Sequence, residues 1–262
     1  MANDFPVVFG ICLDAEASWL GRKPENAQRP VLLSHGTFAI REGLAPLLAL
    51  LKENDIRSTF FVPGITAERH PEAVKEIAKH GHEIGSHTYG HRSVLLLKPG
   101  EEEQELVGGM DALQAITGVK PTTFRSASWE WSSETLPLLI KHGVTASTNF
   151  HDRVRPYRHA LDDKPTPVVE LPVQWHLADA PFFVYGGEIG RVIRTASDVQ
   201  TIWQDEFDGL YDWPGAFYHL TLHVELIGHP GRLRMLANHI KHIKSRSRVQ
   251  FMTAAEVAAT VA

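Results

Sequence analysis

Short apolar runs alternate with amphipathic segments along the chain, and this alternation narrows the possible folds more than any other feature. The runs are rich in β-branched and aromatic residues and are almost continuously apolar, as expected of strands that are buried on both faces. The eight candidate strands occupy residues 7–13, 58–62, 82–86, 122–125, 144–148, 168–173, 216–222 and 249–252.

Helical patterns lie between these runs. Residues 43–54 place four leucines on one face at helical spacing. Residues 71–80 predict a second helix that Gly81 ends, and acids from Glu101 onward begin a third helix after Pro99. Seven or eight β–α units in succession predict an α/β fold, either a parallel barrel or a doubly wound sheet. Capping-box patterns begin two later helices, Ser197 with Gln200 and Thr253 with Glu256.

A single domain is expected over residues 1–262, because no Pro/Gly/Ser-rich linker or short repeat divides the chain. The formal net charge is −5 and there is no basic run, so neither nucleic acid nor a membrane is an expected partner. Cys12 is the only cysteine, which rules out an intramolecular disulfide. No signal-peptide pattern and no apolar run of roughly 20 residues is visible, which predicts a cytoplasmic location.

Ionisable and aromatic side chains follow several of the candidate strands. In a parallel barrel or sheet the carboxyl ends of the strands meet, and functional groups gather there. Asp14 follows the first candidate strand, the HTYGH run follows the third, and His223 follows the seventh. Further members of this predicted cluster are Glu16, Trp19, Arg125, Trp129, Glu130, Trp131, His151, Asp152, Trp175, His176 and Asp179.

His87 and His91 lie four residues apart where a strand is expected to end. Two imidazoles and one carboxylate, such as Asp14, can hold a divalent cation and leave positions open for water and substrate. Zinc in such a site lowers the pKa of its bound water to about 7, which predicts hydrolysis of an ester or amide.

Histidine pairs at this spacing also arise by chance in a chain with 15 histidines, and His219 with His223 is a second pair. Even spacing in a strand puts that pair on one face, so core packing or a hydrogen bond explains His219. His239 and His242, on the last long helix, are expected on the solvated surface.

Asp14, the HTYGH run and the strand spacing resemble the polysaccharide deacetylase (NodB-homology, carbohydrate esterase 4-like) superfamily of metal-dependent carbon–nitrogen hydrolases. The metal motif of that family is H-[ST]-x-x-H, and the closer likeness is to peptidoglycan deacetylase, cyclic imide hydrolase and allantoinase-like enzymes. The resemblance implies a distorted (β/α) barrel with about seven parallel strands. The matching stretches are DAEASWL (14–20), STFFVPG (58–64), GHEIGSHTYGH (81–91), FRSASWEWS (124–132), VELPVQWHLADAP (169–181) and LIGHPGRLRML (226–236).

The resemblance implies a divalent metal ion, zinc by expectation, with Asp14, His87 and His91 as its ligands. Relatives of this subgroup commonly assemble as dimers or tetramers, so a homo-oligomer is expected. The walls of the pocket are expected to include Trp19, Trp129, Trp131 and Trp175, although tryptophans near strand ends are equally often packing residues.

The resemblance also implies two catalytic side chains. His223 matches the histidine that acts as general acid toward the leaving nitrogen, although Val224 follows it here in place of the usual proline. His229, which precedes a proline, is a rival for that role. Arg125 matches an arginine that orients an acidic partner.

Cys12 departs from the family pattern, in which the residue two positions before the metal-binding aspartate is a second aspartate, the general base. Residues two apart in a strand share a face, so the thiol should point into the site. Cys12 is an inert small hydrophobe, a thiolate base or nucleophile, or a fourth metal ligand. Glu16 and Asp179 are substitute bases, unless Glu16 is a solvated loop acid and Asp179 orients His223 or Arg125.

Three functions follow from these residues. The first is a metal-dependent hydrolase that opens a small cyclic imide or amide, favoured by the aromatic-rich site. The second is an N-acetyl deacetylase of an amino sugar or a peptidoglycan-type glycan. The third is a catalytically silent relative that binds a ligand, which the replacement at Cys12 suggests and the complete metal triad opposes.

Overall fold

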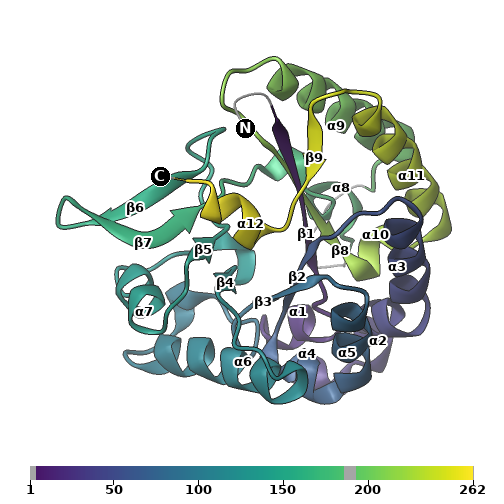
Figure 1. Ribbon diagram of the computed structural model, residues 1–262. Coiled ribbons are helices and arrows are strands. Elements are labelled where there is room, and N and C mark those ends of the chain that lie inside the picture. Colours follow the sequence, from purple (N-terminus) through teal and green to yellow (C-terminus); the bar gives the residue numbers. More distant parts are fainter. Residues whose placement is uncertain (1–3, 186–192, 262) are drawn as a thin grey trace.

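The computed structural model of the protein describes residues 4–185 and 193–261. Figure 1 shows strands curved around a common centre with helices outside them. The order along the sheet is β6-β7-β5-β4-β3-β2-β1-β8, and β9 pairs with β1. The strands are β1 (Phe5–Cys12), β2 (Thr59–Val62), β3 (Glu83–Ser86), β4 (Thr123–Phe124), β5 (Ala146–Ser147), β6 (Tyr157–Leu161), β7 (Lys164–Glu170), β8 (Tyr218–His223) and β9 (Val249–Phe251).

The fold is the predicted distorted (β/α) barrel. Within the described residues, only β6 runs antiparallel to its neighbour, and the β6–β7 hairpin extends to one side (left in Figure 1). The segment after β7 crosses toward β8, where Ala178 forms a parallel bridge with Thr221 and the Asp179 N–H donates to the Thr221 carbonyl. This crossing places Asp179 at the carboxyl end of β8.

Helices alternate with the strands, as the sequence predicted. The helix predicted over 43–54 and the one predicted over 71–80 are both present, and Gly81 follows the second with a φ of +80°. The helices are α1 (Ala17–Leu20), α2 (Pro30–Phe38), α3 (Leu44–Glu53), α4 (Gly64–Arg69), α5 (Pro71–Lys79), α6 (Glu101–Thr117), α7 (Thr135–Lys141), α8 (Ala180–Phe183), α9 (Ala196–Tyr211), α10 (Val224–Ile227), α11 (Pro230–Lys244) and α12 (Ala254–Ala259).

Side chains of β1 alternate between two environments. Phe9 and Ile11 pack into the main apolar core with α3, α9 and α11, whereas Gly10 and Cys12 face Arg125 inside the barrel. A Cβ atom at Gly10 would lie 2.5 Å from Nη2 of Arg125, so only glycine leaves room for the guanidinium. The inner face of β1 is apolar at Val8, which packs with Ala146 and Val169, and carries the polar contacts only toward its carboxyl end.

Several local predictions were wrong. The capping box at Ser197 and Gln200 is absent, because Thr195 caps α9 by accepting from the Asp198 N–H, whereas the Thr253–Glu256 capping box is confirmed. His239 is fully buried rather than solvated, and its Nε2 lies 2.9 Å from the Tyr218 hydroxyl. Among the elements that were not predicted, α2 and β6 lack a clear apolar period, and α1, α8 and α10 are only four residues long. Within residues 4–185 and 193–261, no helix combines the length and apolarity needed to cross a membrane.

Candidate metal centre and active site

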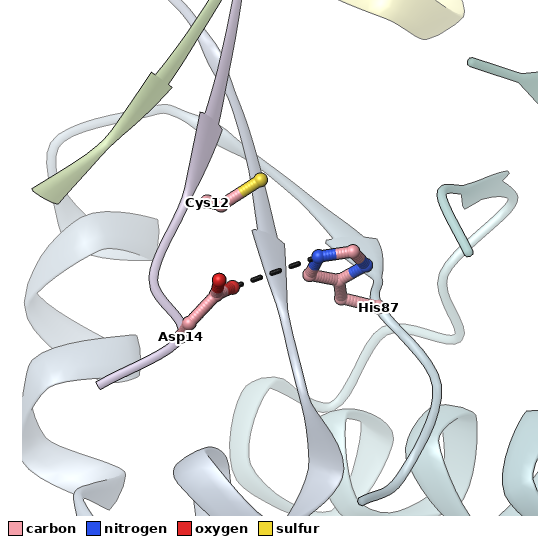
Figure 2. A group of neighbouring side chains, drawn as sticks. All are labelled: Cys12, Asp14 and His87. Atoms are coloured by element: carbon pink, nitrogen blue, oxygen red, sulfur yellow. Dashed lines mark ion pairs between the residues drawn. The ribbon is translucent and has the colours of Figure 1, made fainter. Parts of the chain in front are cut away.

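The carboxyl ends of β1 and β3 bring Asp14, His87 and His91 together. Nε2 of His87 lies 3.6 Å from Oδ1 of Asp14, and Nε2 of His91 lies 3.4 Å from Oδ2. The two imidazole rings are perpendicular, with centroids 4.7 Å apart. Figure 2 shows His87 and Asp14 facing one another, with Cys12 beside them. The sequence-predicted triad is therefore one cluster.

The loop that carries the histidines is held from α6. The backbone N–H groups of Tyr89 and Gly90 both donate to Oε2 of Glu105, at 3.1 and 2.6 Å. Thr88 and His91 have positive φ angles of 62° and 55°, which non-glycine residues adopt only when their surroundings enforce it. The Glu105 carboxylate supplies this constraint, so the loop conformation aims His91 at Asp14.

The cluster has the properties of a metal site. Oδ1 of Asp14 is buried and has no hydrogen-bond partner among the described residues, a state that is costly for a carboxylate unless a cation approaches it. Nδ1 of His87 lies 2.8 Å from the Arg125 carbonyl, and donation there leaves Nε2 free to bind metal. The donor set therefore fits a divalent cation.

Charge states in the cluster also suit a cation. Burial raises the pKa of Asp14, but His91 and His87 outweigh burial and the net pKa is lowered, so the carboxylate is ionised. Burial lowers the pKa of His91 to about 4, which keeps its ring neutral and able to act as a ligand. Burial also lowers the pKa of His87, yet Cys12 and Asp14 raise it overall in the metal-free protein.

Arg125 contacts Cys12 rather than an acidic partner, so this part of the family-based expectation is wrong. Its Nη1 donates to the Cys12 sulfur at 3.3 Å, and Nε donates to the Thr148 hydroxyl at 2.8 Å. Nη2 lies 3.2 Å from Nε2 of His219, and the guanidinium lies over Phe61, 4.1 Å from the ring centroid. Of the two explanations expected for His219, core packing or a hydrogen bond, the buried ring has the hydrogen bond.

The Cys12 thiol lies in a positively charged environment. Burial raises its pKa, but His223 and Arg125 outweigh burial and lower the pKa to about 6. The register explains the proximity, because Cys12 pairs with Phe61 on β2 and with His223 on β8. A thiolate at this position is therefore favoured at neutral pH.

His223 is oriented by Asp179. Nδ1 of His223 donates to Oδ1 of Asp179 at 2.7 Å, and its backbone N–H donates to Oδ2 at 2.8 Å. Burial lowers the pKa of His223, but Cys12 and Asp179 raise it well above its ordinary value. Nε2 lies 3.9 Å from Oδ2 of Asp14. Both oxygens of Asp179 are engaged, which matches the orienting role and opposes the role of substitute base.

A cavity of about 500 Å³ opens above this cluster. Trp19, Trp129 and Trp175 line it as predicted, and the rings of Trp129 and Trp175 are 4.4 Å apart. Trp131 does not line it, because its ring packs on Phe150 and His159. The wall is largely apolar and aromatic. Phe38, Phe183, Val184 and Leu226 complete it.

Two other predicted residues take different places. Glu16 lies outside the cavity lining, where Oε2 pairs with Nε2 of His70 at 2.9 Å, so it is neither a substitute base nor a fully solvated acid. His229 does line the cavity and stacks on Phe38, with centroids 4.0 Å apart, but it makes no contact with Asp179. His223, held by that carboxylate, has the better geometry for a general acid.

Glu225 is a cavity residue that sequence reasoning missed. It is 8% exposed, and its Oε2 is buried without a hydrogen-bond partner among the described residues. Burial and the charge of Asp14 raise its pKa well above the ordinary value. The available signal was its position, two residues after His223 at the start of a helix that follows a strand end.

A buried carboxylate faced by two imidazoles at the carboxyl end of a parallel barrel is the donor set of barrel enzymes that hold a catalytic metal. The profile of the polysaccharide deacetylase family matches residues 26–147. A peptidoglycan deacetylase from Helicobacter pylori is 30% identical over 283 aligned positions, covering 98% of this chain and 96% of that protein. The chain therefore belongs to the polysaccharide deacetylase family.

Two solved structures agree with this assignment. A candidate polysaccharide deacetylase from Mycobacterium smegmatis is 32% identical with a TM-score of 0.93, over 99% of this chain and 90% of that chain. An allantoinase with 22% identity and a TM-score of 0.83, over 97% of this chain and 89% of that chain, shares the fold. Membership makes the protein a hydrolase of carbon–nitrogen bonds and favours an enzyme over a silent relative.

Proposed function

We propose that the protein removes the acetyl group from an N-acetylated amino sugar, using a divalent ion, zinc, held by Asp14, His87 and His91. The observation that carries this proposal is the position of these ligands at the bottom of an aromatic cavity, beside the Asp179-bound ring of His223. The peptidoglycan deacetylase relative, aligned over nearly the full length of both chains, supports a glycan acetamide as substrate.

The bound ion would polarise the acetamide carbonyl and activate water at neutral pH. His223 would hold a proton on Nε2 and deliver it to the nitrogen as the carbon–nitrogen bond breaks. Asp179 keeps Nδ1 protonated and the ring oriented throughout. Trp129 and Trp175 would offer flat apolar faces to the sugar ring.

Ring opening of a small cyclic imide or amide is the second candidate. The shape and lining of the cavity favour it, because about 500 Å³ enclosed by three tryptophans and two phenylalanines suits a flat, compact ring. The same polarised carbonyl and the same proton from His223 would open such a ring. The two candidates therefore differ in substrate and share their residues.

Metal analysis and paired assays test the proposal. Purified protein is expected to contain about one zinc ion per chain by mass spectrometry, and His91→Gln is expected to lose it. The matched control is His80→Gln, since His80 lies outside the cavity and contacts Glu76. Both variants and the parent are assayed for acetate release from N-acetylglucosamine oligomers and for hydrolysis of succinimide.

Acetate release that His91→Gln abolishes and His80→Gln retains would support the deacetylase. Hydrolysis of succinimide alone, with the same dependence on His91, would replace the first candidate by the second. Full activity in a protein stripped of metal would contradict both, since both require the ion.

Three further expectations stay predictions. We propose one catalytic domain over residues 1–262, a cytoplasmic location and a homodimer or homotetramer. Light scattering on purified protein measures the assembly, limited proteolysis tests the single domain, and fractionation of the source cells tests the location.

A further inference from the structure

Cys12 lies at metal-ligand range from the predicted triad. The Cys12 sulfur, one carboxylate oxygen of Asp14 and one ring nitrogen of His87 all lie within 4.8 Å of one another, and all three residues are buried. Figure 2 shows Cys12 and Asp14 extending from the same strand end, on the side that faces His87. The thiol therefore occupies the corner of the site where the family has its general base.

The donor distances approach those around a bound metal ion. Bonds of about 2.0–2.3 Å to nitrogen, oxygen and sulfur separate neighbouring ligand atoms by about 3.3–3.6 Å. The two carboxylate–imidazole separations, 3.6 Å for His87 and 3.4 Å for His91, already have this length. The Cys12 sulfur lies within 4.8 Å of the donor atoms of Asp14 and His87, so all three donors would draw together around one ion.

A second observation independently points to a cation at this place. Oδ1 of Asp14 has no hydrogen-bond partner within the described part of the chain, although Asp14 is only 2% exposed. Oδ1 lies 3.6 Å from Nε2 of His87, in the cluster that also holds Cys12. An ionised oxygen buried in this way requires a positive charge in the space between the three side chains.

We propose that Cys12 is a fourth protein ligand of the metal, bound as a thiolate beside Asp14, His87 and His91, in a five-coordinate site whose fifth position takes water. This inference rests on the proposed metal-dependent function. Its chemical consequence is selectivity, because sulfur prefers zinc, cobalt(II) and cadmium over the harder ions magnesium, manganese and calcium. The hydrogen bond from Arg125 to the sulfur orients the thiolate and reduces the negative charge that it gives to the metal.

The proposal explains why a cysteine stands in the position of a base. A thiolate that accepts a hydrogen bond from Arg125 is a weaker base than a free thiolate. The same contact leaves the sulfur able to bind an ion. The competing roles for Cys12 are a free thiolate base and an inert thiol. Both predict a metal ion that has no contact with sulfur.

Cobalt(II) tests the coordination directly. Protein stripped of metal is loaded with cobalt(II), and its near-ultraviolet spectrum is expected to show an intense sulfur-to-cobalt charge-transfer band. Cys12→Ser is expected to lose the band while still binding cobalt, and to bind zinc at least about tenfold more weakly. Cobalt content of each sample is measured by equilibrium dialysis, and folding by circular dichroism.

X-ray absorption of the zinc-loaded parent protein keeps the test independent of the variant. One sulfur neighbour at about 2.3 Å is expected. The role of Cys12 would be overturned if both ions bind with only nitrogen and oxygen neighbours and the charge-transfer band is missing. The proposed function would still stand. Failure of the parent to bind either ion would overturn this inference, and unchanged hydrolysis after metal removal would identify the proposed function as the part that failed.

Discussion

Asp179 binds His223 at two points, through the ring at 2.7 Å and through the backbone N–H at 2.8 Å. One fully buried carboxylate therefore fixes both the end of β8 and the orientation of the imidazole. The arrangement depends on the crossing segment after β7, which bridges Thr221 immediately before Asp179. The proton donor of the site is thus positioned by the part of the barrel that is not a regular strand.

Asp179→Asn is expected to lower kcat by about 10²–10⁴-fold with little change in KM, because the general acid acts in the transition state. Asp179 helps to raise the pKa of His223, so loss of its carboxylate also lowers that pKa. The alkaline limb of the kcat/KM profile, where the acid loses its proton, should therefore move to lower pH. A change in KM alone would assign the pair to substrate binding.

Gly109 on α6 is the second place where packing controls the site. A Cβ atom there would lie 2.4 Å from the Thr88 carbonyl oxygen, beside His87. Gly109→Ala is expected to destabilise the protein by about 1–3 kcal/mol, the usual cost of overpacking, and to weaken metal binding as the loop moves. Urea unfolding and zinc titration measure the two effects.

Gly209→Ala is the matched control, because it lies in α9 and a Cβ there has no atom within 4 Å. It is expected to leave metal binding unchanged and to stabilise the protein by up to about 1 kcal/mol, since alanine favours helix over glycine. Equal metal affinity in both variants would show that the α6 contact does not set the position of His87.

The sequence predicted the barrel and its site well where local patterns act alone. The runs at β1 and β2 are almost continuously apolar and β8 alternates apolar with polar residues, so these strands appear close to the predicted bounds. The stretches at 122–125 and 144–148 shrink to two-residue strands, because the chain leaves the sheet early, to carry Arg125 into the site and to let Asn149 accept from the Ser126 N–H. No local period signals that departure.

Other features depend on residues distant in the chain. The burial of His239 follows from a partner, Tyr218, that is 21 residues away, and α11 alone does not reveal it. The exclusion of Trp131 from the cavity follows from packing on Phe150 and His159. The contact of Arg125 with Cys12 requires the register of β1, β3 and β4, which motifs indicate only by resemblance.

Glu225→Gln is expected to stabilise the metal-free protein at high pH. The folded-state pKa of Glu225 is raised, so the folded protein holds a proton that the unfolded chain has released above its ordinary pKa. Between the unfolded-state and the folded-state pKa of Glu225, the free energy of unfolding therefore falls by about 1.4 kcal/mol for each pH unit. Glutamine removes the loss, so the variant should exceed the parent at pH 8 and equal it near pH 4.

Unfolding in urea at the two pH values measures this difference. Glu134→Gln is the control, because Glu134 is an exposed acid at the start of α7. A parent and a Glu225→Gln variant with the same pH dependence would mean that the carboxyl is ionised in the folded protein.

His239→Gln tests the second buried titratable group outside the site. Burial lowers the pKa of His239 to about 3, while the unfolded chain has an ordinary histidine value near 6.5. Between pH 6.5 and pH 3, His239 is therefore protonated in the unfolded chain and neutral in the folded protein. The stability that its neutral ring gives above pH 6.5 is lost as pH falls through this range. Between pH 7.5 and pH 5 the free energy of unfolding of the parent should fall by about 2 kcal/mol more than that of the variant.

Glutamine is chosen because its amide N–H replaces the ring N–H that Nε2 of His239 gives to the Tyr218 hydroxyl, which in turn donates to the Trp203 carbonyl. The control is Lys241→Gln, on the exposed side of the same helix, and it should follow the parent at both pH values. Because every other group that titrates between pH 5 and pH 7.5 is common to the three proteins, the difference between them isolates His239. A His239→Gln protein that loses as much stability as the parent would show that this ring becomes protonated without unfolding, through local opening of α11 against β8.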